Sequence, residues 1–281
     1  MPSLAILMTV HNRRQQTLAC LQAVFAQQPV SGYHWEIYLT DDGCSDGTPE
    51  AIAEKFPSVH IIKGDGNLYW NRGMYKAWEA ASKEKDFDFY LWLNDDTYVY
   101  PYMLSEVLSI SEQSGNQAII VGSVQASDHS MVTYGGWLNK KGIPAPDGTP
   151  ISVDYFNGNL VLIPGSIFKK LGNLDYYFSH SKGDYDYGLR AKKSGISIYQ
   201  TGKILGECDM HESIDKWCDP QYSFRKRWQL LHRPNGMPPK ETFHLERKNL
   251  GFGKAAFHFC TVYVRCVFPT LWILANKATK G

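Results

Sequence analysis

Short apolar runs alternate with amphipathic segments through the first 125 residues. Apolar residues recur at helical spacing near 18–25, where Asn12 is placed to cap the helix, and near 74–81. Prolines open further expected helices at 49–56 and 101–115. β-Strands are predicted by the runs at 4–10, 35–39, 59–62, 87–93 and 119–124. This alternation predicts an α/β domain with a parallel, doubly wound sheet.

Beyond residue 125 the alternation ends. Glycine-rich stretches at 135–137 and 142–150 predict loops between short strands. A strand is expected at 155–163 with Asn157-Gly158-Asn159 inside it, and a glycine there indicates a bulge or a close approach of ligand. Helices at 167–171 and 184–193, a strand at 196–199 and a helical, aromatic tail from 222 complete the prediction. We therefore expect one domain over 1–215, with halves 1–125 and 126–215, and a C-terminal extension over 216–281.

Composition narrows the class of protein. The 281 residues are 43% hydrophobic with a net charge of +1, which suits one large or two modest globular domains. Nucleic acid is not expected as a partner, because binding it normally needs a basic face. The six cysteines show no C-x-x-C pair or zinc-like spacing, and residues 1–4 lead into a strand without a signal-peptide pattern. A reduced, cytoplasmic protein is the simplest interpretation.

Carboxylates follow two of the predicted strands. The run at 90–93 breaks into Asn94-Asp95-Asp96, and the strand at 35–39 is followed by Asp41-Asp42. The carboxyl ends of parallel strands meet at one edge of a sheet, where ligands bind. Adjacent carboxylates repel unless a cation offsets them, and Mg²⁺ uses one or two carboxylates together with phosphate oxygens. The pattern predicts a metal–phosphate site; a solvated acidic turn is the alternative.

The loop at 41–48 is short, contains two glycines and leads into a helix. It lacks both the G-x-G-x-x-G spacing of a dinucleotide fold and the lysine of a P-loop. We expect its carboxylates to accept hydrogen bonds from a ribose or a base. A turn that caps the next helix explains the same residues.

Five motifs, taken together and in this order, strongly resemble the family 2 glycosyltransferases, which are inverting enzymes with the GT-A fold that use nucleotide-diphosphate sugars. The motifs are TVHNR (9–13), DDGCSDGT (41–48), GNLYWNRGM (66–74), NDD (94–96) and GDYDYGLR (183–190), and the similarity covers residues 3 to about 211. The branch it resembles most contains rhamnosyltransferase-like enzymes that build bacterial surface polysaccharides. The resemblance implies a mainly parallel central sheet flanked by helices. It also implies transfer from a UDP- or dTDP-sugar to a hydroxyl of a saccharide or lipid-linked saccharide.

The resemblance assigns roles to residues by position. Asp96 and His211 are expected to hold Mg²⁺ or Mn²⁺, and Asp42 is the expected base or ribose contact. Asn94 stands where the family often has aspartate, which puts strict metal dependence in question. The donor site is expected in the half 1–125, with the residues Thr9, His11, Asn12, Arg13, Asp41, Asp42, Gly66, Asn67, Trp70, Arg72, Asn94 and Asp95.

Asp184 falls where the family places its catalytic base, although Gly183 replaces an acidic residue common before it. An acceptor hydroxyl loses its proton as it attacks the anomeric carbon, so a carboxylate within hydrogen-bond reach serves as general base. The acceptor is expected in the half 126–215, at Asn159, Asp186 and Trp137. Arg190, four residues after Asp186, is placed to pair with it.

Structural explanations remain open for several of these residues. Asp184 also suits a helix cap, because acidic side chains favour helix N-termini. His11 and His211 also suit surface or packed positions, and Trp70 and Trp137 also suit the core.

The segment 255–274 is apolar and aromatic but contains His258 and Arg265, which argues against a membrane-spanning helix. Basic residues surround it, a pattern that suits an interfacial segment on an anionic membrane. Packing onto the catalytic domain and a homodimer interface are the alternatives. If this segment lies on a membrane and the acceptor is lipid-linked, we expect the protein at the inner face of the cytoplasmic membrane.

Two other functions are compatible with the sequence. A sugar nucleotidyltransferase has a related sheet and acidic site, but no glycine- and lysine-rich phosphate loop lies near this N-terminus. A non-catalytic nucleotide-sugar-binding module would bind without turnover and would not respond to Asp184→Asn.

Overall fold

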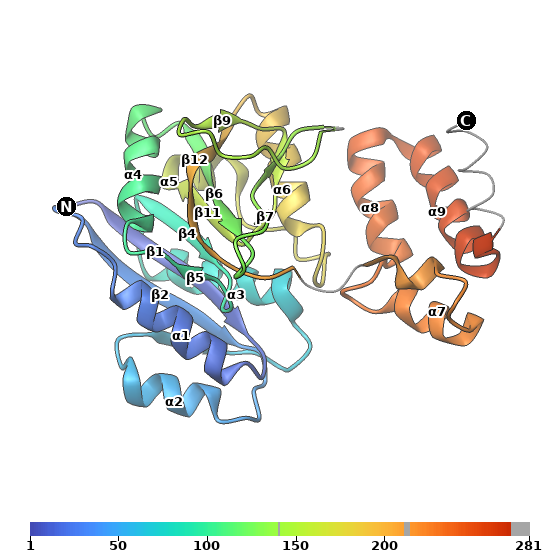
Figure 1. The fold of residues 1–281 in the computed structure, drawn as a ribbon, viewed down its shortest axis with the longest axis horizontal. Helices are drawn as coiled ribbons and strands as arrows, with labels where there is room; N and C mark the ends of the chain where they lie inside the picture. The colour runs from blue at the N-terminus through green and yellow to red at the C-terminus, as the bar shows by residue number, and fades with distance from the viewer. Residues whose placement is uncertain (140, 211–213, 271–281) are drawn as a thin grey trace. The chain divides into compact units, whose positions relative to one another are not determined.

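The computed structural model describes residues 1–139, 141–210 and 214–270 (Figure 1). The chain forms two compact units, one of residues 1–176 with 183–210 and the other of residues 177–182 with 211–281. The first unit contains the segments in which the sequence predicts alternating strands and helices.

The N-terminal half of the first unit is a parallel sheet with the strand order β3-β2-β1-β4. β1 and β4 are mostly apolar and almost fully buried, as expected for central strands of a parallel sheet, whereas the edge strand β3 is only partly buried. The elements are β1 (Ser3–Val10), α1 (Arg14–Phe25), β2 (His34–Asp41), α2 (Thr48–Lys55), β3 (His60–Lys63), α3 (Tyr69–Glu84) and β4 (Phe89–Leu93).

The second half extends this sheet with strands of both directions. β11 is antiparallel to both β4 and β6, whereas β12 is parallel to β6, so β6 and β12 point the same way as β1 and β4. The short strands β5 and β9 are antiparallel to β12, and β7 is antiparallel to β6. The long strands of the sheet are therefore mainly parallel, as expected, with β11 inserted in the reverse direction. The elements here are β5 (Tyr98–Val99), α4 (Met103–Gln113), β6 (Ala118–Gln125), β7 (Val132–Tyr134), β8 (Gly136–Trp137), β9 (Ile151–Ser152), β10 (Tyr155–Phe156), β11 (Leu160–Pro164), α5 (Gly165–Leu171), α6 (Gly183–Lys193) and β12 (Ser197–Glu207).

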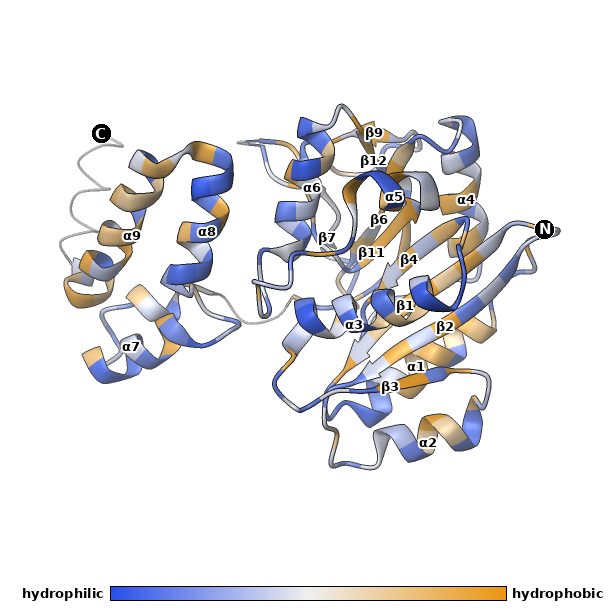
Figure 2. Cartoon of the chain, turned by 180° about the vertical axis from the view of Figure 1, so that it is seen from behind, coloured by the Kyte–Doolittle hydropathy of each residue, from blue (hydrophilic) through white to orange (hydrophobic). Residues whose placement is uncertain are grey.

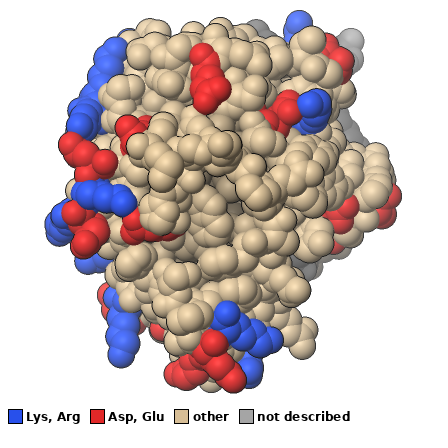
Figure 3. All heavy atoms as spheres, turned by 90° about the vertical axis from the view of Figure 1, so that its left-hand side faces the viewer, with Lys and Arg blue, Asp and Glu red and all other residues tan. Residues whose placement is uncertain are grey.

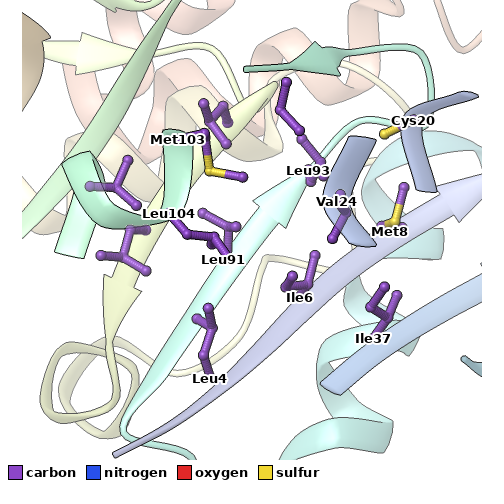
Figure 4. Packing of buried hydrophobic residues seen from close by; sticks show 14 of the residues in the cluster. Leu4, Ile6, Met8, Cys20, Val24, Ile37, Leu91, Leu93, Met103 and Leu104 are labelled. Atoms are coloured by element: carbon purple, nitrogen blue, oxygen red, sulfur yellow. The ribbon is translucent and has the colours of Figure 1, made fainter. Parts of the chain in front are cut away.

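Helices cover both faces of the sheet. α1, α2 and α4 pack on one face, and α3, α5 and α6 pack on the other (Figures 1 and 2). On the first face, Leu4, Ile6 and Met8 of β1 lie beside Leu91 and Leu93 of β4 (Figure 4). Each fully buried side chain of this size contributes about 2 kcal/mol through the hydrophobic effect, so the core holds the strand ends in fixed positions.

Two local predictions were wrong. The strand expected at 155–163 is two strands: β10 pairs with β8, β11 joins the main sheet, and residues 157–159 lie between them. Asn12 does not cap α1, because its φ of +52° places it in the left-handed region and Arg13 occupies the cap position without a side-chain cap bond. The strand expected at 196–199 is longer, because β12 continues to Glu207.

The second unit is helical in its described part. After a 3₁₀ turn at Ile214–Cys218 it contains α7 (Phe224–His232), α8 (Pro239–Leu250) and α9 (Phe252–Val267). Ser223 caps α7 by accepting a hydrogen bond from the Lys226 backbone N–H, the usual role of serine at this position. No helix in the described ranges has the length and apolar character needed to cross a bilayer.

Charged side chains of both signs are mixed on the face of the molecule in Figure 3. They surround a broad area without lysine, arginine, aspartate or glutamate among the described residues drawn there.

Candidate functional site

The carboxyl ends of β1, β2 and β4 meet at one edge of the sheet, as the sequence predicts. β1 leads into residues 11–13, β2 into Asp42 and β4 into residues 94–96. Arg13 joins two of these ends directly, because its Nη1 lies 3.3 Å from Asp95 Oδ1 and also contacts Asp96 Oδ2. We call this group of strand ends the acidic edge.

Asp42 organises the loop before α3. Its buried carboxylate accepts hydrogen bonds from the backbone N–H groups of Gly66 (2.9 Å), Leu68 (3.1 Å) and Tyr69 (2.8 Å). Gly66 has a φ of +83°, which favours glycine. Asp42 therefore fixes the segment that contains Gly66 and the exposed Asn67. Its expected contact with a base or ribose stays a prediction and would add to these three bonds.

Residues 11–12 are tied to the loop after β2. His11 Nδ1 lies 2.6 Å from Asp42 O, and Asn12 Oδ1 accepts a hydrogen bond from the Ser45 backbone N–H at 2.7 Å. The Asp41 carboxylate accepts one from the Cys44 backbone N–H at 2.8 Å. Burial, together with this carboxylate, raises the pKa of the Cys44 thiol to about 12, so Cys44 is a neutral packing residue. These contacts hold two predicted donor segments against each other.

Asp95 and Asp96 differ in their surroundings. Asp95 is buried and also accepts a hydrogen bond from Thr17 Oγ1 at 3.2 Å. Burial raises the pKa of Asp95 to about 7, although Arg13 acts in the opposite direction. Asp96 Oδ1 accepts a long hydrogen bond from the Cys208 thiol at 3.6 Å. Asp95 is therefore held inside the protein, and Asp96 is the carboxylate that β12 approaches.

Cys208 is a site residue that the sequence analysis did not identify. It directly follows β12, and Asn159 Nδ2 lies 3.8 Å from its sulfur. Burial, then the neighbouring Asp96, raise the pKa of this thiol to about 12, so it donates to Asp96 as a neutral thiol. A polar residue directly after a strand was the available signal. His211, which the sequence predicted as a metal ligand, lies outside the described residues.

The contacts of Asn94 explain why an amide side chain suits this position. Trp70 Nε1 donates a hydrogen bond to Asn94 Oδ1 at 2.7 Å, and the Asn94 backbone N–H donates to Asn159 O at 3.0 Å. An amide oxygen accepts the indole N–H without adding a third negative charge beside Asp95 and Asp96. The departure from aspartate at position 94 thus fits its contacts.

Asp184 reaches the same edge from α6. Its Oδ2 accepts a hydrogen bond from the Gly158 backbone N–H at 3.0 Å, and its Oδ1 accepts one from the Tyr185 N–H at 2.8 Å. A Cβ on Gly158 would lie 2.4 Å from the Trp70 ring and 3.3 Å from Asp184 Cβ. Gly158 thus lets Asp184 approach Trp70, which is bonded to Asn94.

Other predicted residues have supporting contacts. Thr9 packs under α3, where a Cβ on Gly73 would lie 2.1 Å from Thr9 Oγ1. Arg72 Nε donates to Tyr176 O at 3.1 Å, and its guanidinium lies over the Tyr176 ring. Both residues position α3, and a direct donor contact by either stays a prediction.

Asp186 is fully buried and pairs with Arg190 at 2.9 Å, which confirms the expected i, i+4 pair. Arg190 also donates to the backbone oxygens of Leu171 and Asn173. The pair therefore anchors α6, and a contact between Asp186 and an acceptor would first require it to open.

Trp137 belongs to a row of aromatic rings. It stacks on Tyr155 with centroids 6.1 Å apart and planes at 8°, and Tyr155 meets Tyr185 edge to face at 4.5 Å. Trp137 Nε1 donates to Asn157 Oδ1 at 2.7 Å. Because Tyr185 follows Asp184, this row leads toward the predicted base. Tyr155 and Tyr185 were not identified as site residues from the sequence.

The described side chains bring few candidate metal ligands together. Among the described residues, no three His, Cys, Asp or Glu side chains gather as a complete cage. Mg²⁺ bound to phosphates needs only one or two protein carboxylates. Asp96, with its partner Arg13 displaced, fits that limited role; metal binding itself stays a prediction.

Comparisons with known proteins agree on one family. The family model described as Glycosyl transferase family 2 matches residues 5–171. The chain is 24% identical over 222 residues to an uncharacterized glycosyltransferase, RT0329, of Rickettsia typhi, covering 75% of this chain and 65% of that protein. It is 23% identical over 229 residues to N-acetylglucosaminyl-diphospho-decaprenol L-rhamnosyltransferase of Mycobacterium tuberculosis, covering 71% of this chain and 73% of that protein.

Solved structures of S. aureus TarS share the fold. TarS 1-349 in complex with UDP matches with a TM-score of 0.56 at 12% identity, over 89% of this chain and 74% of that one. The complex with UDP-GlcNAc matches with a TM-score of 0.55 at 13% identity, over 92% and 73%. The chain spans 42% of a longer TarS structure and 65% of the rickettsial relative.

Proposed function

Because this chain belongs to glycosyl transferase family 2 and has the GT-A fold, we propose that it is an inverting glycosyltransferase. Its donor is a nucleotide-diphosphate sugar, a UDP- or dTDP-sugar. Its acceptor is a hydroxyl of a saccharide or lipid-linked saccharide, in the synthesis of a bacterial surface polysaccharide.

This proposal rests on one observation, that Asp184 lies close to the acidic edge. Asp184 lies on α6, more than 80 residues along the chain from Asn94, yet the contacts of Gly158 and Trp70 bring the two together. Inverting transfer needs a base on one side of the anomeric carbon and a leaving group on the other. An acidic edge for the diphosphate and a separate carboxylate for the acceptor supply these two sides.

The donor half is preorganised for binding. Asp42 holds the 66–69 segment through three backbone bonds, and His11 and Asn12 are tied to the loop after β2. Groups fixed before binding lose little entropy when a ligand arrives. We assign Arg13 to the diphosphate and Asp96 to its cation. A divalent ion held by Asp96 would stabilise negative charge on the departing nucleoside diphosphate.

Asp184 is the proposed general base. The acceptor hydroxyl gives its proton to an Asp184 carboxylate oxygen as the hydroxyl oxygen bonds to the anomeric carbon. The bond from that carbon to the diphosphate oxygen breaks on the opposite face, which inverts the configuration. The backbone N–H groups of Gly158 and Tyr185 hold the carboxylate in one orientation for this step.

The acceptor class is supported by a relative and by the second unit. The mycobacterial relative is named for a lipid-linked N-acetylglucosaminyl substrate. In the second unit, α9 exposes Phe252 (69%), Phe257 (66%) and Val264, and Phe268, which directly follows α9, is also exposed. This unit has 13 lysines and arginines against 5 aspartates and glutamates, a net charge of +8. Exposed aromatic residues in a basic unit favour contact with an anionic membrane, at its cytoplasmic face, where a lipid-linked acceptor is presented.

Two alternative functions predict different reactions. A sugar nucleotidyltransferase would join a nucleoside triphosphate to a sugar phosphate and release pyrophosphate. A non-catalytic module would bind a nucleotide sugar without consuming it.

A thermal-shift panel tests the proposal. UDP, dTDP, GDP and CMP are each added with and without Mn²⁺ or Mg²⁺, because a ligand that binds only the folded state raises the melting temperature. We expect a metal-dependent rise with UDP or dTDP. No rise with any nucleotide contradicts the proposal. Release of pyrophosphate from a nucleoside triphosphate and a sugar phosphate would support the nucleotidyltransferase instead.

A further inference from the structure

Arg13 is a cation that the acidic edge already holds. Its guanidinium contacts both Asp95 and Asp96. The side chains of Asp95 and Asp96 keep 9% and 10% of their exposure, whereas that of Arg13 keeps 39%. The positive group is therefore the accessible member of the cluster, and it lies at the carboxylate expected to bind a divalent ion.

Each of the two carboxylates has a hydrogen-bond donor besides Arg13. Asp95 Oδ2 lies 3.2 Å from Thr17 Oγ1 in the first turn of α1, and this hydroxyl shares its one proton between Asp95 and the Arg13 backbone oxygen, which lies at 2.9 Å. The Arg13 backbone oxygen also accepts a hydrogen bond from the Thr17 N–H at 2.9 Å, so this turn stays fixed when the Arg13 side chain moves. Asp96 has Arg13 on Oδ2 and the weak Cys208 thiol donor on Oδ1. Arg13 and the thiol are on different oxygens of Asp96, so Arg13 can leave Oδ2 without breaking the thiol contact.

We propose that Arg13 is an exchangeable counter-ion of Asp96, an inference that rests on the proposed function. Without donor, Arg13 neutralises Asp96. When the donor binds, the guanidinium moves to the diphosphate, which it can hold with two parallel hydrogen bonds. Asp96 Oδ2 is then released for the divalent ion that accompanies the diphosphate.

The exchange couples the two ligands. A guanidinium and a divalent cation repel each other at one carboxylate, so Arg13 weakens metal binding while it is in place. The diphosphate removes Arg13 from Asp96 and thereby favours the metal. By linkage, the metal favours the nucleotide by the same factor. Loss of the guanidinium should strengthen binding of the metal alone and weaken binding of the nucleotide, which are opposite effects of one substitution.

The test is Arg13→Gln, with Mn²⁺ and UDP or dTDP as probes, whichever the wild type binds. Free Mn²⁺ is measured by electron paramagnetic resonance without nucleotide, and nucleotide binding by calorimetry with Mn²⁺. We expect Arg13→Gln to bind Mn²⁺ alone about tenfold more tightly and the nucleotide about tenfold more weakly than the wild type. Arg14→Gln is the matched control, because it removes the same charge at the next, exposed position, the first residue of α1, and it should leave Mn²⁺ binding unchanged.

Arg13→Gln leaves Asp95 without its cation, so folding is checked by circular dichroism. If the variant does not fold, Arg13→Gln with Asp95→Asn removes the buried carboxylate and is expected to show the same opposite effects. Equal Mn²⁺ affinity in the folded variant and the wild type overturns the inference, as does a joint loss of Mn²⁺ and nucleotide binding. A wild type that binds no nucleotide rejects the proposed function, while the comparison with Mn²⁺ alone still tests the exchange at Asp96.

Discussion

The two units of the chain differ in charge and in core. The first has 16 lysines and arginines against 23 aspartates and glutamates, a net charge of −7, whereas the second has a net charge of +8. The overall charge of +1 conceals this difference. An acidic unit suits a site that needs a divalent cation, and a basic unit suits an anionic surface. Net charge is therefore informative for each unit and misleading for the whole chain.

The hydrophobic cores of the two units differ in size. The first unit buries large hydrophobic clusters on both faces of its sheet, which fix the strand ends that carry the acidic edge. The second unit buries a small described cluster, and its helix α9 exposes several large apolar side chains. We interpret the first unit as the part that carries the chemistry and the second as the part that contacts a membrane.

The largest effect is expected from Asp184→Asn in the first unit. The amide keeps the size of the side chain and an oxygen for the Gly158 N–H, but it cannot take the acceptor proton. We expect transfer to fall about 10³-fold, within the range for loss of a general base, with donor binding unchanged. Turnover is measured by release of the nucleoside diphosphate, and binding by calorimetry. Asp186→Asn is the contrast, since it breaks the buried pair with Arg190 and should lower stability. Full turnover by Asp184→Asn would remove Asp184 as base.

The second-largest effect is expected from Phe257→Glu in the second unit. Phe257→Glu places a charge on the exposed side of α9. Because transfer of a phenylalanine side chain from water contributes about 2 kcal/mol, we expect binding to vesicles with phosphatidylglycerol to weaken about tenfold or more. Cosedimentation measures the bound fraction, and Met131→Glu, at an exposed position of the first unit, is the matched control. Equal binding by wild type and Phe257→Glu contradicts the membrane role, and concentration-dependent dimers of the wild type would favour a dimer interface.

A smaller effect is expected from Asn94→Asp. The substitution adds a carboxylate beside Asp95 and Asp96 and loses no volume. In metal-free protein we expect the free energy of unfolding to fall by about 1–2 kcal/mol through like-charge repulsion, and Mn²⁺ should restore more stability to this variant than to the wild type. Urea titrations with and without Mn²⁺ measure both quantities. A variant as stable as the wild type without metal would show that the acidic edge tolerates a third negative charge.

The last effect concerns pH. The pKa of Asp95 is about 7 in the folded protein, mainly through burial, against an ordinary value of 3.8. Between these values the folded state keeps a proton that the unfolded state has lost, so this group makes stability fall as pH rises from about 4 to about 7 and adds no further change above that. We expect Asp95→Asn to flatten this part of the melting-temperature profile in metal-free protein. The same slope in both proteins would show that Asp95 does not titrate there.

The sequence was most informative where the chain is locally regular. The central strands β1, β4 and β6 of the first unit are buried along almost their whole length, so their apolar runs identify them, and the carboxylates after β2 and β4 follow from strand order. The reversal of β11 could not be predicted, because residues 157–159 redirect the chain through contacts with distant residues such as Trp137 and Asn94.

Long-range contacts also explain the site residues that were missed. Cys208 contacts Asp96 across 112 positions of sequence, and the three backbone partners of Asp42 lie more than 20 residues away. Helical spacing gave the pairing of Asp186 with Arg190 but not its burial, because spacing does not say which side of α6 faces the core. Residue type and order therefore identified the edge, and packing decided which side chains face it.

Nucleotide binding by Asp96→Ala tests the central claim, that the acidic edge of the first unit binds a nucleotide diphosphate with a divalent ion. Calorimetric titrations of UDP and dTDP into the wild type and Asp96→Ala, each with and without Mn²⁺, give four affinities for each nucleotide. We expect Mn²⁺ to tighten binding of one nucleotide to the wild type and to have no effect on Asp96→Ala. An equal gain from Mn²⁺ in both proteins would contradict the claim, because the ion would then bind away from Asp96.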